Sequence, residues 1–100
     1  MKRYRALERF YKRGDFYGMN PEAHVHALPS ENACVVNLFN LSDQPRTITG
    51  EIPLKQMHLD SARAYRSDSA WARVENGTLR MSLETPPWSA EVAEVRPAGP

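Results

Sequence analysis

The longest apolar run in the chain spans residues 32–43 and is rich in β-branched and aromatic side chains. Turn-forming and polar residues bound it, at 29–31 on one side and at 42–45 on the other. This pattern predicts a strand that is buried on both faces. Alternation predicts one face formed by Cys34, Val36 and Leu38 and another formed by Ala33, Val35, Asn37 and Phe39. We expect the sheet of the protein to be built around this strand.

The first residues of the chain show a helical period instead. Residues 2–13 contain no helix breaker, and their large apolar side chains recur at helical spacing, at Tyr4, Leu7, Phe10 and Tyr11. This stripe predicts a short helix that ends at Gly14, followed by a linker over residues 15–21. So short a helix needs a surface to lie on, either in this domain or in one that precedes it.

Period-two alternation dominates the rest of the chain, with turn signals roughly every 8–12 residues. Besides the central strand, the predicted strands cover residues 22–28, 46–52, 62–66, 70–75, 78–84 and 88–96. Asn76-Gly77 is the strongest hairpin signal, because both residue types accept the positive φ of a type I′ turn. The strands do not alternate with helices, which argues against a parallel sheet.

These patterns predict an all-β fold, an Ig-like antiparallel β-sandwich of about seven strands with a short N-terminal helix. The expected division is a helix and linker at residues 1–21 and a β-sandwich domain at residues 22–97. The length of 100 residues is that of one domain.

Composition and charge narrow the classes of partner. A net charge of +1 gives no reason to expect nucleic acid or an anionic membrane surface. The single cysteine, Cys34, excludes an intrachain disulfide, and its apolar surroundings predict a small buried side chain. The sequence has no signal peptide and no apolar stretch long enough to span a bilayer, which predicts a cytoplasmic location if the chain is complete.

Candidate metal chemistry is confined to His24 and His26. Both fall on one face of a predicted strand, at a spacing that lets two imidazoles reach one metal ion. A zinc site needs further ligands, and neither Cys34 nor His58 is expected nearby. We therefore expect no metal and no cofactor, and interpret the pair as ring side chains packed on a half-exposed strand face.

Catalytic chemistry has no support in the sequence. The acidic residues fall in turns or at exposed strand positions, where nothing in their surroundings raises a carboxyl pKa. The sequence contains no glycine-rich phosphate loop, no Gly-x-Ser-x-Gly elbow and no Cys–His nucleophile arrangement. We expect no catalytic residue in this chain.

Aromatic side chains offer a different kind of site, since a flat ring stacks on the apolar face of a sugar. Trp71 alternates with Arg73 and Glu75 and is expected on a polar, exposed face, which makes it the main candidate for carbohydrate binding, together with Tyr65. Trp88 alternates with apolar residues and is expected in the core. An exposed tryptophan also serves as an interface residue, and that alternative stays open.

Several segments in order carry a family resemblance. The first is a predicted helix that ends in Arg13-Gly14-Asp15-Phe16-Tyr17, followed by a short strand and then by the strand and turn Val36-Asn37-Leu38-Phe39-Asn40-Leu41-Ser42-Asp43-Gln44-Pro45-Arg46. After these come the short strand Ala64-Tyr65-Arg66-Ser67, the Asn76-Gly77 hairpin, and the last segment from Leu83 through Pro86-Pro87-Trp88-Ser89-Ala90-Glu91-Val92. Their order resembles the C-terminal β-sandwich domain that follows the (β/α)₈ catalytic barrel in glycoside hydrolases of the α-galactosidase and α-amylase kinds. The likeness covers most of residues 11–96, and its best piece is Phe39–Asp43 followed by Arg46.

The resemblance implies a non-catalytic accessory domain that packs against the catalytic barrel and stabilises it. The catalytic carboxylates of such enzymes lie on the barrel, so none can be assigned to this chain. Residues 1–21 then resemble the tail of a missing catalytic domain, whose aromatic stripe packed on that neighbour or now joins two copies in a homodimer. The alternative is a free-standing carbohydrate-binding module that uses Trp71. The resemblance gives no role to His24 and His26.

Overall fold

The computed structural model describes residues 8, 10–11, 14–20 and 22–98 of the chain. Within these residues the chain forms eight β-strands and two short 3₁₀ helices. In chain order they are β1 (Asp15–Asn20), β2 (Ala23–Leu28), η1 (Pro29–Glu31), β3 (Ala33–Asn40), β4 (Arg46–Pro53), η2 (Leu54–Met57), β5 (Tyr65–Ser67), β6 (Ala72–Glu75), β7 (Thr78–Thr85) and β8 (Ser89–Pro97).

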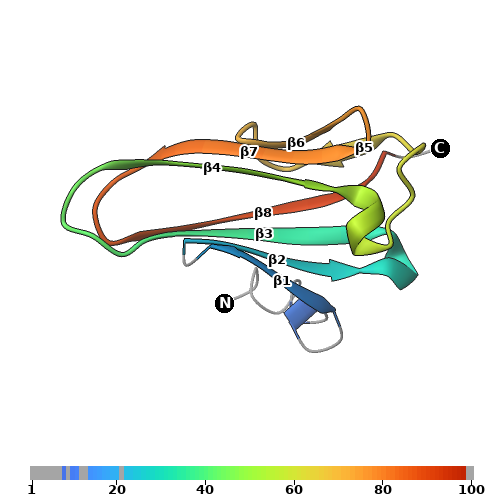
Figure 1. Ribbon diagram of the computed structural model, residues 1–100, viewed down its shortest axis with the longest axis horizontal. Helices are drawn as coiled ribbons and strands as arrows, with labels where there is room; N and C mark the ends of the chain where they lie inside the picture. Colours follow the sequence, from blue (N-terminus) through green and yellow to red (C-terminus); the bar gives the residue numbers. More distant parts are fainter. Residues whose placement is uncertain (1–7, 9, 12–13, 21, 99–100) are drawn as a thin grey trace.

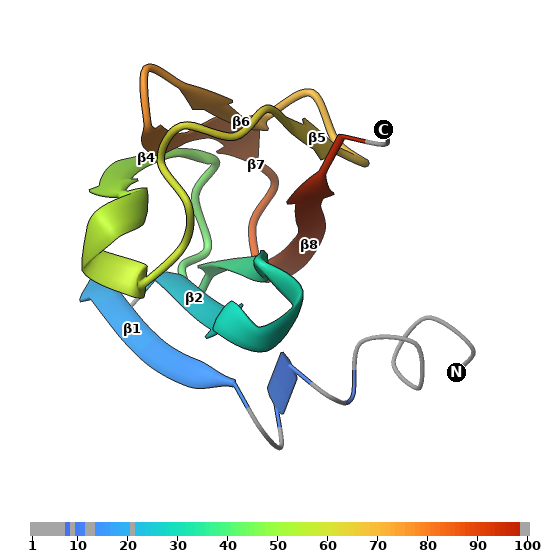
Figure 2. The ribbon, with the colours of Figure 1, turned by 90° about the vertical axis from the view of Figure 1, so that its right-hand side faces the viewer.

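The strands form two antiparallel sheets that face each other (Figure 1). One sheet has five strands in the order β1-β2-β3-β8-β5, and the other has three in the order β4-β7-β6. The view along the strands shows the five-stranded sheet curving until β5 comes beside β6 (Figure 2). The protein is therefore a compact all-β structure of the sandwich kind, and the expected antiparallel all-β class is confirmed.

The chain changes sheet twice at the same end of the molecule. The connections from β3 to β4 and from β7 to β8 both lie at the left-hand end in Figure 1. The two connections also lie next to each other. The strands before and after them pair in both sheets, β3 with β8 in one and β4 with β7 in the other. This crossover end therefore brings together residues 41–45 and 86–88.

The central strand β3 is buried on its inner face and over the first half of its outer face, whereas the sequence predicts burial along both; Asn37 and Phe39 are half-buried. Its inner face carries Cys34, Val36 and Leu38, which belong to the main core between the sheets. Its outer face carries Ala33 and Val35, which belong to a second, smaller apolar cluster. The predicted assignment of these residues to the two faces is confirmed.

The second cluster contains Phe10, whose side chain is 0% exposed against Leu28, Ala33 and Val35. Glu8, Phe10 and Tyr11 are helical, and the rest of the helix predicted over residues 2–13 lies outside the described residues. The surface on which Phe10 packs is thus the outer face of the chain's own five-stranded sheet.

A close approach of backbone explains the glycine at the end of this segment. The Gly14 backbone N–H donates to the carbonyl of Phe10 (3.0 Å). A Cβ atom at position 14 would lie 2.4 Å from that oxygen and 2.7 Å from the carbonyl oxygen of Ala27. Only a residue without a side chain fits between the N-terminal segment and β2 without a backbone shift.

Several element bounds differ from the sequence prediction, and two segments differ most. The linker expected at residues 15–21 is wrong, because Asp15–Asn20 forms the edge strand β1, which pairs with β2. The strand expected at residues 62–66 is displaced, because residues 61–63 form turns and β5 spans Tyr65–Ser67. Pairing with a neighbouring strand decides both segments, and short runs carry little signal of their own.

Candidate functional site

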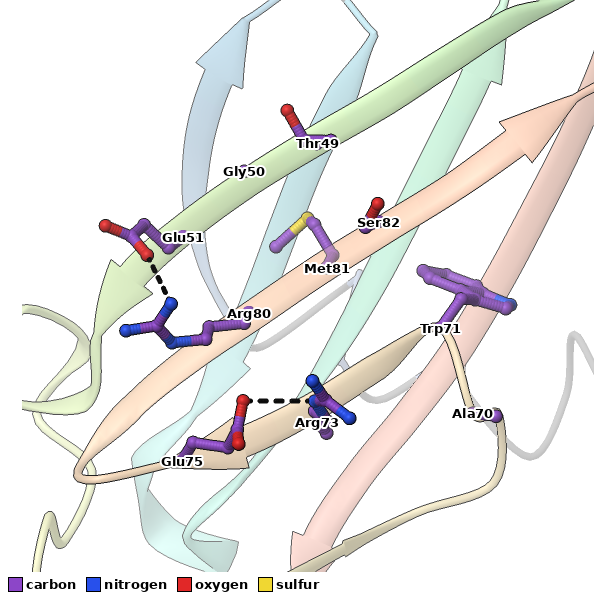
Figure 3. A pocket seen from close by; sticks show the side chains of 10 residues that line it. All are labelled: Thr49, Gly50, Glu51, Ala70, Trp71, Arg73, Glu75, Arg80, Met81 and Ser82. Atoms are coloured by element: carbon purple, nitrogen blue, oxygen red, sulfur yellow. Dashed lines mark ion pairs between the residues drawn. The ribbon is translucent and has the colours of Figure 1, made fainter.

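The outer face of the three-stranded sheet carries a surface hollow of about 520 Å³ (Figure 3). Its lining residues come from β4, β6, β7 and the turn before β6: Thr49, Gly50, Glu51, Ala70, Trp71, Arg73, Glu75, Arg80, Met81 and Ser82. Strand alternation creates this face, because Ile48, Ile52 and Leu79 fill the core while the residues between them point outward. Trp71 is the one residue of this lining that the sequence singled out as a ligand contact.

Strand register brings four charged side chains of the hollow together. Glu51 stands opposite Arg80, and Arg80 stands opposite Arg73. Arg80 Nη1 lies 3.3 Å from Glu51 Oε2, and Arg73 Nε lies 3.1 Å from Glu75 Oε1. Two arginines directly opposite each other repel. Here each has its own carboxylate partner, so the charges in the hollow balance.

Trp71 lies at the end of the hollow away from these ion pairs (Figure 3). Its carbonyl accepts a hydrogen bond from the Ser82 backbone N–H (2.9 Å), which extends the β6–β7 ladder by one residue. The side chain is half-buried and packs partly against the main core. This anchoring fixes the ring beside the polar groups of the hollow, an arrangement suited to a ligand with both apolar and polar faces.

Tyr65, the second carbohydrate candidate, lies on β5 and is not among the residues that line the hollow. Its hydroxyl donates to the carbonyl of Asp60 (2.8 Å), and its ring packs partly against the main core. Burial raises the pKa of this phenol, so the hydroxyl stays a proton donor at neutral pH. In this position Tyr65 holds the 60–65 turn against the sandwich.

His24 and His26 lie in a cluster of rings on the outer face of β2. The His26 ring centroid is 4.8 Å from that of Tyr11 and 5.2 Å from that of Phe16, and the His24 centroid is 5.2 Å from that of Phe16. Burial lowers the pKa of His26, and the charge of His24 lowers it further. Across the described part of the chain, no three metal-ligating side chains form a group.

Trp88 contradicts the sequence prediction, since its side chain is 68% exposed and not in the core. The residue precedes β8 and adopts a positive φ of 52°, which takes it out of the strand alternation used to predict its face. Its backbone N–H donates to the carbonyl of Ser42 (3.2 Å), so it is fixed at the crossover end. The turn residues Pro86-Pro87 are the sequence signal that Trp88 still belongs to the turn before β8.

Cys34 is buried in the main core, and this burial raises the pKa of its thiol to about 12. A thiol with so high a pKa is not a nucleophile at neutral pH. The expected role of Cys34 as a small buried side chain is confirmed.

No protein-family profile matches the sequence, and comparison with curated proteins and with solved structures also yields no significant match. Among the described residues, no helix is both long enough and apolar enough to cross a membrane. Functional inference therefore depends on the fold, the hollow and the residues that form them.

Proposed function

We propose that the protein is a non-catalytic accessory domain of a carbohydrate-active glycoside hydrolase, an Ig-like β-sandwich that packs against the catalytic barrel and stabilises it. The observation that carries this proposal is the structural role of the motif behind the resemblance, Phe39–Asp43 followed by Arg46. These residues form the end of β3, the turn after it and the start of β4, at the crossover end of the sandwich.

Asn40 is the centre of this motif, and its side chain is fully buried. Its Nδ2 group donates to the carbonyl oxygens of Gln44 (2.9 Å), Thr85 (3.2 Å) and Pro86 (2.9 Å). Its Oδ1 atom accepts from the backbone N–H (3.0 Å) and the hydroxyl (2.9 Å) of Ser42. One amide therefore ties together the two sheet-changing connections at the crossover end, β3 to β4 and β7 to β8.

Arg46 completes the motif with an ion pair between the two sheets at the same end. Its Nη1 atom lies 2.8 Å from Glu22 Oε2, which links the start of β4 to the residue before β2. Its carbonyl accepts a hydrogen bond from the Thr85 hydroxyl (2.9 Å). The motif is thus a device for building this crossover, which supports a kinship in fold with domains that carry it.

The lining of the hollow supports the non-catalytic part of the proposal. Glycoside hydrolysis needs two carboxyl groups facing each other across the scissile bond. Glu51 and Glu75 instead contact Arg80 and Arg73 on an open sheet face. Each of these carboxylates therefore has a cationic partner in place of a second carboxyl group.

The test starts from the DNA beside the coding region, where we expect a (β/α)₈ barrel to be encoded directly upstream. That barrel, produced without this domain, should form a one-to-one complex with the purified chain, and its Tm should rise by several degrees on binding. A flanking region without a barrel, or a barrel whose Tm and activity do not respond to the chain, overturns the proposal.

A second candidate function is a carbohydrate-binding module, and the specific observation that favours it is the position of Trp71 in the hollow. A half-buried, anchored indole beside hydroxyl, guanidinium and carboxylate groups offers an apolar surface and polar contacts together. Titration with oligosaccharides, followed by tryptophan fluorescence, tests this function. A saturable change that is lost in Trp71→Ala supports it, and no response to any sugar in a folded protein rejects it.

A further inference from the structure

We propose that the hollow on the three-stranded sheet selects a neutral oligosaccharide over an acidic one, with its two Arg–Glu pairs binding the sugar hydroxyls beside Trp71. This inference rests on the second proposed function, carbohydrate binding through Trp71. It adds the class of sugar and the residues that set the choice.

The charged side chains that line the hollow balance one another. The hollow contains two arginines and two glutamates, and each arginine contacts one glutamate. An acidic sugar or a phosphate would meet guanidinium groups that already have partners and carboxylates that repel it. A neutral ligand meets no such repulsion, so the balanced lining favours it.

The Arg–Glu pairs can also form hydrogen bonds to a ligand. A guanidinium has five N–H donors and a carboxylate two acceptor oxygens, and each ion pair uses a single close N···O contact. Arg73 and Arg80 thus keep further donors, and Glu51 and Glu75 keep an acceptor oxygen. Neighbouring sugar hydroxyls both donate and accept, which matches a surface where donors and acceptors alternate.

The spacing of residues along the strands sets the distance between Trp71 and the Arg–Glu pairs. Thr49 stands opposite Ser82, whose backbone bonds to Trp71, so these three residues form one row across the sheet. Glu51, Arg80 and Arg73 form the next row on the same face. Rows two residues apart lie about 7 Å from each other. A ring stacked on Trp71 therefore leaves the next unit of a short oligosaccharide over the Arg–Glu pairs.

The experiment uses the full chain with Trp88→Phe, because the sequence has two tryptophans and this change leaves Trp71 as the only one. Maltohexaose, cellohexaose, mannohexaose and galactomannan oligosaccharides are titrated against oligogalacturonate of equal length at low salt. We expect a saturable fluorescence change with at least one neutral sugar, and at least about tenfold weaker binding of oligogalacturonate.

Glu51→Gln is the decisive variant, because it leaves Arg80 without its carboxylate partner. We expect this variant to bind oligogalacturonate about tenfold more tightly than the parent and the neutral sugar more weakly. Glu84→Gln removes the same charge from an exposed site on β7 outside the hollow and serves as the matched control. Circular dichroism and the denaturation midpoint show whether each variant is folded.

The outcomes separate this inference from the function on which it rests. Tighter binding of oligogalacturonate by the parent, or identical behaviour of Glu51→Gln and Glu84→Gln, overturns the neutral selectivity and leaves carbohydrate binding in place. The absence of binding to either class of sugar overturns both. Neither result bears on the accessory-domain proposal, which the barrel complex tests on its own.

Discussion

At the scale of single residues, we expect the loss of the buried Asn40 side chain to destabilise the protein strongly. Asn40→Ala removes the donor shared by three carbonyl oxygens and the acceptor of Ser42 at a fully buried position. Buried polar groups left without partners are costly, so we expect the free energy of unfolding to fall by about 2–4 kcal/mol. Urea denaturation followed by tryptophan fluorescence measures it.

The neighbouring Leu41 provides the control for this prediction. Its side chain is 62% exposed in the same turn, so Leu41→Ala should change the free energy of unfolding by no more than about 0.5 kcal/mol. Equal effects of the two substitutions would show that the Asn40 hydrogen bonds do not hold the crossover end together.

His26 should make stability depend on pH in the acid range. Burial, with the charge of His24 second, lowers its folded pKa from the usual 6.5, so unfolding takes up a proton. The free energy of unfolding should therefore fall as the pH drops below about 6.5. Because His26→Gln removes this proton uptake, the variant should lose less stability than the parent between about pH 7.5 and 5.5.

Urea denaturation at a series of pH values measures the effect of His26. His58→Asn is the control, because His58 is exposed and asparagine tolerates its left-handed backbone, at a φ of 60°. Parallel stability curves for the parent and His26→Gln would contradict the prediction.

Strand β3 and Trp88 show what residue patterns can and cannot predict. The faces of β3 follow from alternation alone, and Cys34 and Val36 lie where the sequence places them. Alternation holds only inside a strand, and the sequence does not mark its first residue sharply. Alternation therefore predicts Trp88 in the core, although the residue lies just before β8 and has a left-handed backbone.

At the scale of elements, the β6–β7 hairpin depends on the backbone of its turn. Asn76 and Gly77 adopt positive φ values of 51° and 73°, as the sequence predicts for this dipeptide. Gly77→Ala puts a side chain on a left-handed residue, with its Cβ 3.3 Å from that of Ser61. We expect a loss of about 1–2 kcal/mol in the free energy of unfolding, measured by urea denaturation.

Asn76→Gly is the matched control for the hairpin, because glycine adopts the same φ without strain. It should shift the free energy of unfolding by a few tenths of a kcal/mol, roughly the general effect of an unstrained turn substitution. A loss in Asn76→Gly as large as that in Gly77→Ala would assign the effect to something other than positive φ.

The strand β1 shows why short elements escape sequence analysis. Asp15–Asn20 has two adjacent aromatics and a glycine, which suggests a linker. Its β structure comes from the free edge of β2, to which it pairs from Asp15 opposite Ala27 to Asn20 opposite Ala23. This pairing depends on the neighbouring strand β2, so it cannot be predicted from the sequence of the segment alone.

At the scale of the whole molecule, the candidate site depends on which strands share a sheet. Glu51 and Arg80 come together only because β4 pairs with β7 in one register, although many strand pairings are compatible with the same alternation. The sequence identified Trp71 and its polar face but gave no means of finding Glu51 or Arg80 as its neighbours. Those two residues are visible as a site only after the fold is known.

The outer face of the five-stranded sheet provides the last prediction, which concerns how Phe10 covers it. Phe10 covers Leu28 and Val35 there with a side chain that is 0% exposed, whereas the side chain of Phe16 on β1 is 57% exposed. Phe10→Ala should therefore cost about 3–5 kcal/mol in the free energy of unfolding and increase the binding of a hydrophobic dye. Phe16→Ala, the control, should cost under about 1 kcal/mol. Equal small costs would mean that Phe10 does not cover this face in solution.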